Sequence, residues 1–257
     1  MRFAALILFF MAAQAAAQCT AESGPGTAAL VELYTSEGCS SCPPADRWLA
    51  SLGQRYAAGS VVPLALHVDY WDYIGWKDPY AKREFSLRQR KLSQLQRMAL
   101  VYTPQVLLQG RDFRGWGSKA FDEALARINA QPAKARMRLK LLTFDKDSLE
   151  VEASAELVAP TADAALYLAV YASRLESRVS AGENRGRILS HDYVVLEWQG
   201  PSPVSSRLVE RRRLALLPGA QAANSGVAAF VQNRRTGEVL QALMRSACQG
   251  RNSGSGS

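Results

Sequence analysis

The feature that most constrains the fold is a pair of cysteines between an apolar run and a helical pattern. Residues 28–34 are mostly apolar, as in a short buried strand, and they lead directly towards Cys39. After Cys42, two prolines suit the first turn of a helix, where the missing N–H costs little. Apolar residues then recur at helical spacing, at Ala45, Trp48, Leu49 and Leu52. The sequence therefore predicts a strand-to-helix junction that carries both cysteines.

The rest of the first half alternates between strand-like and helix-like segments. Residues 61–68 indicate a second buried strand, and residues 80–98 indicate a polar helix with one apolar stripe. A hairpin that turns at Gly110 and a helix that begins at Ser118 are expected to follow. This alternation predicts an α/β layer fold for residues 18–133.

The second half has the period of a sheet. Apolar and polar residues alternate over residues 149–157, which is typical of a strand with one buried face. Further strand candidates lie at 137–143, 166–171, 193–198, 213–217, 227–232 and 239–243. We place a domain boundary at Gln131-Pro132-Ala133, after which residues 134–250 are predicted to form an all-β, sandwich-like domain.

The two ends of the chain have a different character. Residues 1–17 combine Arg2, an apolar centre and three small residues at 15–17, which together predict a secretory signal peptide. No later run is long and apolar enough to span a bilayer, so no stable membrane insertion is expected after cleavage. We therefore expect a periplasmic or secreted protein. Residues 251–257 indicate a flexible tail or an expression remnant.

The net charge of +8 raises the question of an acidic partner. The basic clusters at 134–140 and 211–213 do not lie among the aromatic residues that a nucleic-acid platform would use. Solvated surface is the interpretation that we favour, and no nucleic acid is expected as a partner.

The spacing of Cys39 and Cys42 favours redox chemistry. Backbone N–H groups and the helix dipole stabilise a thiolate at the start of a helix. A structural disulfide and a metal site use the same spacing, but structural zinc needs two further ligands, and His67 and His191 are the only histidines. We predict that Cys39 and Cys42 are catalytic, with no metal and no cofactor.

Cys19 and Cys248 lie near the two ends of the mature chain. Chain ends are often close together, and disulfides persist in an oxidising compartment. We expect a structural disulfide between them. The alternative is two unpaired cysteines.

A group of polar and aromatic residues follows the second strand and is a candidate for a pocket near Cys39. It comprises His67, Asp69, Tyr70, Trp71, Asp72 and Trp76. Packing within a loop is the plainer interpretation, and His67 is more often a satisfied core histidine than a site residue. Trp71 is our candidate for substrate binding.

Several motifs resemble those of known proteins. The order strand, Cys39-Ser40-Ser41-Cys42-Pro43, strand, helix, Thr103-Pro104, hairpin and helix resembles the thioredoxin fold. More narrowly, residues 32–46 with 67–72 resemble a family of secreted bacterial thioredoxin-like proteins of unknown function, as do residues 182–184 and 191–193. The resemblance implies an α/β thioredoxin-like domain in which Pro104 is cis and faces the disulfide. It also implies that Thr103 and Pro104 bind an extended substrate segment.

These observations lead to three hypotheses about function. The first is a thiol-disulfide oxidoreductase whose partners are protein or peptide thiols and disulfides in the periplasm. The second is a module for copper or another soft metal that uses Cys39, Cys42 and His67. The third is a binding protein that retains a redox fold without turnover.

Overall fold

The computed structural model describes residues 19–145, 147–216 and 221–248. The predicted signal peptide (1–17) and tail (251–257) lie outside the described residues. The helices are α1 (Pro43–Arg55), the 3-10 helix η1 (Asp69–Ile74), α2 (Arg83–Leu95) and α3 (Lys119–Asn129). The strands are β1 (Thr20–Glu22), β2 (Ala29–Thr35), β3 (Val61–His67), β4 (Gln105–Leu108), β5 (Arg111–Asp112), β6 (Ala135–Phe144), β7 (Ser148–Leu157), β8 (Ala164–Ala172), β9 (Leu175–Arg178), β10 (Ile188–His191), β11 (Val194–Pro203), β12 (Arg207–Ala215), β13 (Ser225–Asn233) and β14 (Val239–Ser246). Among the described helices, none is long and apolar enough to cross a bilayer.

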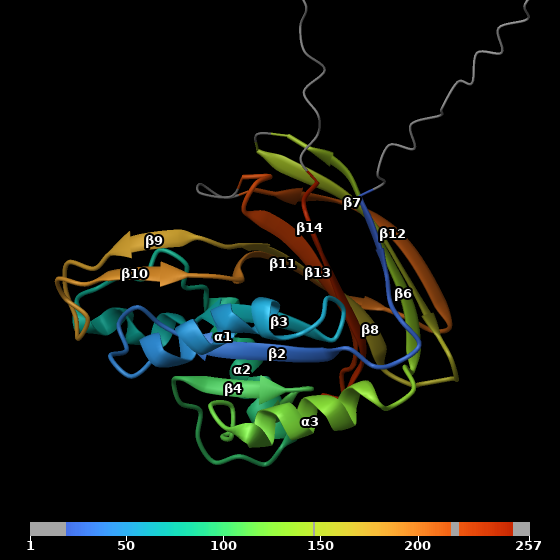
Figure 1. The fold of residues 1–257 in the computed structure, drawn as a ribbon, viewed down its shortest axis with the longest axis horizontal. Coiled ribbons are helices and arrows are strands. Elements are labelled where there is room, and N and C mark those ends of the chain that lie inside the picture. Colours follow the sequence, from blue (N-terminus) through green and yellow to red (C-terminus); the bar gives the residue numbers. More distant parts are fainter. Residues whose placement is uncertain (1–18, 146, 217–220, 249–257) are drawn as a thin grey trace, which may run out of the picture.

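One large sheet contains strands from both halves of the chain (Figure 1). Its order is β14-β13-β8-β11-β3-β2-β4-β5. β2 and β3 run parallel, and β4 runs antiparallel to β2. β11 joins the halves, because it pairs antiparallel with β8 and meets β3 in parallel where Val194 lies opposite Ala65.

This sheet shows that the predicted fold class is wrong. We expected an α/β thioredoxin-like domain followed by an all-β domain. Within the described residues, three α-helices accompany fourteen strands, and β2, β3, β4 and β5 continue into the same sheet as β8, β11, β13 and β14. The physical reason is that β11 is buried at Val194 and Val195 and that Val194 pairs with Ala65, a residue of β3 about 130 positions earlier in the chain. Local periodicity carries no information about such a partner.

A second sheet, in the order β1-β6-β7-β12, packs against the β8 and β13 part of the large sheet. Its alternating inward residues include Leu139, Val151 and Ala153, which meet Leu168 and Ala229 from the large sheet. This face-to-face packing of two sheets is consistent with a β-sandwich.

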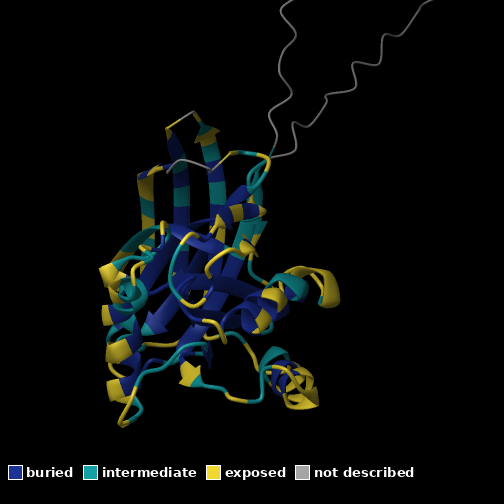
Figure 2. Ribbon diagram, turned by 90° about the vertical axis from the view of Figure 1, so that its left-hand side faces the viewer, coloured by how far each residue is buried: buried dark blue, intermediate teal, exposed yellow. Residues whose placement is uncertain are grey.

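Helices cover the remaining parts of the large sheet. α1 and α3 pack Trp48, Leu49 and Phe121 against one face, and α2 packs Phe85 and Leu92 against the other. Figure 2 shows buried strands at the centre and exposed residues on the outer sides of the helices. The sheet is therefore a buried platform whose loops carry the polar residues described below.

A buried ion pair fixes α2 to the sheet. Nε of Arg88 donates to Oε1 of Glu32 at 2.6 Å, and its Nη2 donates to Oε2 at 3.1 Å. The guanidinium also lies 4.7–5.2 Å from the ring centroids of Tyr167, Trp198 and Phe230. Glu32 is fully buried, so Arg88 supplies the opposite charge that this carboxylate needs.

Candidate functional site

Cys39 and Cys42 form a disulfide at the start of α1, with their Cα atoms 5.5 Å apart. β2 ends at Thr35, and the chain turns through a short loop in which the N–H of Cys39 donates to the carbonyl of Ser36. α1 begins at Pro43, and the carbonyl of Cys42 accepts hydrogen bonds from the first turn. The structure therefore confirms that a strand ends shortly before Cys39 and that a helix begins directly after Cys42. The helix N-terminus favours negative charge, and therefore a thiolate, at these cysteines.

The disulfide is enclosed. Both cysteines have an exposed fraction of 0%, although Ser40 and Ser41 between them are exposed. A two-stranded arm, β9 and β10, extends on the side of α1, and the loop between its strands reaches the cysteine loop (Figure 1). The backbone at Cys39 is thus in contact with a segment more than 140 residues later in the chain.

Asn184 and Glu183, in the loop of this arm, bind the backbone around Cys39. The side-chain amide of Asn184 donates to the carbonyl of Glu37 at 2.8 Å and to the carbonyl of Cys39 at 3.0 Å. The N–H of Ser40 donates to Oε2 of Glu183 at 2.9 Å. Hydrogen bonds from Ser40 lower the pKa of the Glu183 carboxyl. Three of the backbone groups in this loop are therefore satisfied by the second half of the chain.

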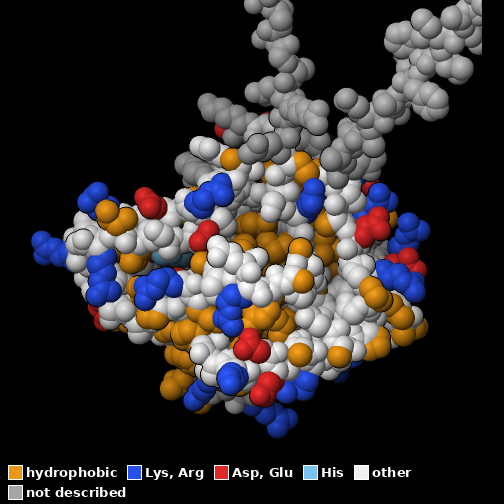
Figure 3. Space-filling model, in the orientation of Figure 1, with side chains coloured by type: hydrophobic (Ala, Val, Ile, Leu, Met, Phe, Trp, Pro, Cys, Tyr) orange, Lys and Arg blue, Asp and Glu red, His pale blue; other side chains and the backbone are white. Residues whose placement is uncertain are grey.

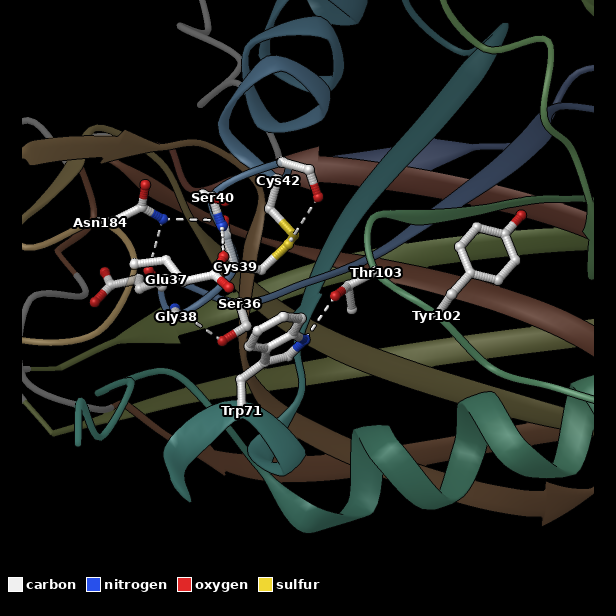
Figure 4. The surroundings of a disulfide bond; sticks show 12 residues. Ser36, Glu37, Gly38, Cys39, Ser40, Cys42, Trp71, Tyr102, Thr103 and Asn184 are labelled. Atoms are coloured by element: carbon white, nitrogen blue, oxygen red, sulfur yellow. Dashed lines mark hydrogen bonds between the residues drawn. A yellow bond between two sulfur atoms is a disulfide. The ribbon is translucent and has the colours of Figure 1, made fainter. Parts of the chain in front are cut away.

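Trp71 and Thr103 approach the cysteine loop from another side (Figure 4). Nε1 of Trp71 donates to Oγ1 of Thr103 at 2.7 Å, and a Cβ added to Gly38 would lie 3.1 Å from Cβ of Trp71. The peptide bond between Thr103 and Pro104 is cis. The structure thus brings Trp71, Thr103 and the cysteine loop together, and whether they bind a substrate stays a prediction.

Two histidine–carboxylate pairs are buried next to the cysteine loop. Nδ1 of His67 lies 2.7 Å from Oδ2 of Asp78, and Nε2 of His191 lies 3.0 Å from Oε1 of Glu37. The ring centroids of the two histidines are 5.0 Å apart. Asp78 also accepts the N–H of Glu37, at 2.8 Å, so the two pairs form one network.

Charge and burial compete in the pair of His67 and Asp78. Burial is the largest single cause for His67 and lowers its pKa, but the carboxylates of Asp78, Asp46 and Glu37 together outweigh burial, so the pKa of His67 is raised. Burial is also the largest single cause for Asp78 and raises its pKa, but His67 and the N–H groups of Glu37 and Tyr80 together outweigh burial, so the pKa of Asp78 is lowered. Both shifts favour a charged pair.

Asp46 lies one helical turn after Cys42 and is buried beside this network. Burial raises the pKa of its carboxyl, although His191 and His67 act in the opposite direction. Among the buried polar atoms of the described residues that have no hydrogen-bond partner are Oδ1 of Asp46, Nε2 of His67 and Nδ1 of His191. Several unsatisfied polar atoms in one region are the usual setting for an internal water, which binds two to four such partners.

No group of three His, Cys, Asp or Glu side chains is arranged to hold a metal ion in the part of the chain that the structure describes. Cys39, Cys42 and His67 therefore do not form a ready three-ligand site for a soft metal in this oxidised form.

The other two cysteines, Cys19 and Cys248, also form a disulfide, with Cα atoms 5.7 Å apart. It connects the residue before β1 to the segment after β14, and both residues are half-buried. All four cysteines are thus oxidised, and none of the described cysteines is free.

Two cavities lie away from the disulfide. One, of about 440 Å³, lies between α3 and β14 and is lined in part by Phe113 and Leu240. Another, of about 630 Å³, lies between the end of α1 and β14 and is lined in part by Tyr171, Tyr193 and Met244. Figure 3 shows a hollow with hydrophobic side chains on the face where α1 and β14 meet. Neither cavity includes Cys39 or Cys42.

Sequence reasoning missed most of the residues that surround the cysteines. Glu37, Asp46, Glu183 and Asn184 were not predicted to belong to the site. The signal for these residues was the resemblance of residues 32–46, 182–184 and 191–193 to the same secreted family. Such a signal indicates that a segment belongs with the motif, but it does not reveal the hydrogen bonds of Asn184.

Comparison with known proteins identifies the family. The profile described as "Protein of unknown function (DUF1223)" matches residues 30–232, which is most of the chain. The chain belongs to this family. No functionally curated protein matches it. The DUF1223 match spans both the cysteine motif and Asn184.

Two solved structures are similar to this DUF1223 chain. A crystal structure of a structural genomics target from Agrobacterium tumefaciens has a TM-score of 0.62 and 25% sequence identity. The match covers 89% of this chain and 98% of that one. HBP35 of Porphyromonas gingivalis has a TM-score of 0.65 and 15% identity, covering 91% of this chain and 80% of that one. This second likeness concerns the fold alone.

Proposed function

We propose that this protein is an exported thiol-disulfide oxidoreductase that acts through Cys39 and Cys42. The observation that carries the proposal is the disulfide between these residues at the N-terminus of α1. Backbone N–H groups and the helix dipole there stabilise the thiolate that exchange requires. The resemblance of residues 32–46 to secreted thioredoxin-like proteins supports the same chemistry and a relationship to the thioredoxin superfamily.

Reduction of a substrate begins from the dithiol form. The Cys39 thiolate attacks one sulfur of the substrate disulfide, a mixed disulfide forms, and the other substrate sulfur leaves as a thiolate. The Cys42 thiolate then attacks Cys39 Sγ, which restores the Cys39–Cys42 disulfide and releases the second substrate thiolate. Two electrons pass from the protein to the substrate, and protons from solvent neutralise the product thiolates. Oxidation of a substrate is the reverse sequence.

Asp46 is the residue best suited to accept the proton of the Cys42 thiol. It lies on the same helix one turn later, it is buried, and burial raises the pKa of its carboxyl. A buried carboxyl with a raised pKa accepts a proton nearer to neutral pH than an exposed one. We assign it as the proton acceptor when Cys42 becomes a thiolate.

The redox state of the cysteines supports the proposed compartment and partners. Disulfides form and persist in oxidising environments such as the periplasm, and this chain has two of them. Protein or peptide thiols and disulfides in that compartment are the proposed partners.

Trapping of the mixed disulfide tests the proposal. In the Cys42→Ser variant the resolving sulfur is missing, so Cys39 is expected to accumulate a covalent adduct with a disulfide-containing peptide. The Cys39→Ser variant is the matched control and is expected to form none. Wild-type protein that is fully reducible but does not turn over insulin or a defined peptide disulfide would refute the proposal.

The complete burial of Cys39 favours a second candidate, a binding protein in which the pair is a stable structural disulfide. The reduction potential of the pair separates the two. A value of roughly −120 to −270 mV is typical of exchange proteins, whereas a value below about −300 mV is typical of structural disulfides.

A further inference from the structure

The Cys19–Cys248 disulfide is more accessible than the Cys39–Cys42 disulfide. Cys19 and Cys248 are half-buried, whereas Cys39 and Cys42 each have an exposed fraction of 0%. Disulfide exchange requires that an attacking thiolate reaches one of the two sulfur atoms. The bond that connects the segments before β1 and after β14 therefore meets the first condition for attack from solution.

A guanidinium lies against one sulfur of this bond. Nη2 of Arg245 donates to Sγ of Cys248 at 3.3 Å. Among the described residues, no carboxylate pairs with Arg245, and its Nε is buried without a hydrogen-bond partner. An adjacent arginine stabilises a thiolate. Because no neighbouring acid neutralises Arg245, its full charge is available to a thiolate at Cys248.

The surroundings of Cys19 have the opposite polarity. The carbonyl oxygen of Ser246 lies 3.7 Å from Sγ of Cys19, and its partial negative charge repels a thiolate at that sulfur. The N–H of Cys248 donates to the same sulfur at 3.1 Å, but a neutral donor stabilises an anion less than a guanidinium does. Cys248 is therefore the better position for a thiolate.

This asymmetry decides which sulfur leaves when the bond is broken. The sulfur that forms the more stable thiolate leaves faster, so an incoming thiolate attacks the other sulfur. The difference between a charge-assisted and a neutral hydrogen bond corresponds to about tenfold in an equilibrium constant. Attack at Cys19 is therefore favoured over attack at Cys248 by about this factor.

We propose that the Cys19–Cys248 disulfide is a second exchange site, which a small-molecule thiol opens by attack on Cys19. The external thiolate forms a bond to Sγ of Cys19, the bond between Cys19 and Cys248 breaks, and Cys248 leaves as a thiolate beside Arg245. The external thiol is oxidised to a mixed disulfide, Cys248 is reduced, and the proton of the thiol goes to solvent. Cys19 is thereby the residue that carries a thiol adduct.

Mapping of the first product tests the inference. The oxidised wild type is treated with glutathione, quenched with acid at low conversion, alkylated and analysed by peptide mass spectrometry. The expected product has glutathione on Cys19 and the alkyl group on Cys248, in an excess of about ten to one over the opposite product. Equal amounts of the two products, an excess of adduct on Cys248, or no adduct at either cysteine would overturn the inference.

Arg245→Met removes the charge and keeps an apolar side chain of similar length. The excess of adduct on Cys19 is expected to fall below about two to one, because only the neutral donor at Cys19 remains. Arg245→Lys keeps a positive charge and is expected to retain an excess. An unchanged ratio in Arg245→Met would overturn the inference, and if this variant does not fold, the product ratio of the wild type decides.

The matched control is Arg138→Met. It breaks the ion pair between Arg138 and Glu22, which fastens β1 to β6, but neither residue contacts a sulfur atom. The ratio is expected to stay within about twofold of the wild type. The Cys39→Ser, Cys42→Ser double variant is expected to give the same ratio, since this exchange site does not depend on the function proposed for Cys39 and Cys42. A large change in either control would overturn the role of Arg245.

Discussion

Glu37 and His191, which are 154 residues apart in the sequence, share a buried hydrogen bond of 3.0 Å. Glu37 precedes Cys39 by two residues, and His191 is the last residue of β10. The other carboxylate oxygen of Glu37 accepts Nε1 of Trp76 at 2.8 Å. A single carboxylate therefore connects the cysteine loop, the residues after η1 and the β9–β10 arm.

Removal of His191 is expected to destabilise the whole fold. The His191→Ala variant removes one of the buried hydrogen-bond partners of Glu37, and a buried acceptor left without its partner costs about 1–3 kcal/mol. Urea unfolding measures the loss. Arg211→Ala, which breaks an exposed pair with Glu152, is the control and is expected to cost less than about 1 kcal/mol. Equal losses in the two variants would contradict the prediction.

Stability is expected to be greatest between about pH 4 and pH 6.5, because of His67 and Asp78. The raised pKa of His67 gives a contribution that is complete below the unfolded pKa, about 6.5, and is lost as the pH rises through the folded pKa. The lowered pKa of Asp78 gives a contribution that is present above about pH 3.8 and is lost as the pH falls through its folded pKa.

Thermal unfolding between pH 3 and pH 9 measures this profile. The His67→Gln variant is expected to lack the part of the loss above about pH 6.5 that belongs to His67. The raised pKa of Asp46 also disfavours the folded state as the pH rises, but this loss begins at about pH 3.8, below the range of His67, and it is present in both proteins. A wild type and a His67→Gln variant that lose stability in parallel above pH 6.5 would rule out the assignment.

Arg88 is expected to be required for stability and not replaceable by lysine. Arg88→Ala leaves Glu32 buried and unpaired, at a cost of about 3–5 kcal/mol. Arg88→Lys loses the two-point contact and the stacking on aromatic rings, so more than about 1 kcal/mol is expected. Chemical denaturation measures both. Arg90→Ala, at an exposed position of the same helix, should change little, and the Arg88→Met, Glu32→Gln double variant should recover most of the loss.

Loss of the Cys19–Cys248 disulfide is expected to cost stability without affecting exchange at Cys39. The bond closes a loop of 229 residues, for which the chain-entropy relation gives up to about 5 kcal/mol. The double variant Cys19→Ser, Cys248→Ser is compared with the wild type by denaturant unfolding and by its rate with a peptide disulfide. A large fall in that rate with little change in stability would show that the two disulfides are coupled.

Most strands and helices could be predicted from the sequence, because each has a strong local period. The run at 166–171 is apolar at nearly every position, and β8 is indeed buried on both faces at the centre of the sheet. β9 and β10 were not predicted, since each has only four residues and their exposed and buried positions alternate too briefly to stand out. The pairing of β11 with β3 could not be predicted, because it depends on two edges far apart in the chain.

In the candidate site, too, the local motif could be predicted from the sequence, whereas the contacts between distant segments could not. Cys39, Cys42 and the helix after them are close together in the sequence, so their arrangement could be predicted from the spacing of the residues. Asn184 is an ordinary polar residue in a loop. Its side chain donates hydrogen bonds to two carbonyls more than 140 positions earlier, which the sequence does not reveal. Asp46 belongs to the motif at residues 32–46 that resembles the secreted family, but its burial follows from the packing of α1 against the sheet and cannot be deduced from the spacing.

The bond between Cys19 and Cys248 has a mechanical consequence. A pulling force applied at these two residues is carried by the covalent disulfide, and neither β1 nor β14 bears the load. The strands between Cys19 and Cys248 would separate from the sheets under this force only after the disulfide is reduced. In single-molecule stretching, the reductant in the buffer would therefore decide whether the chain extends at all.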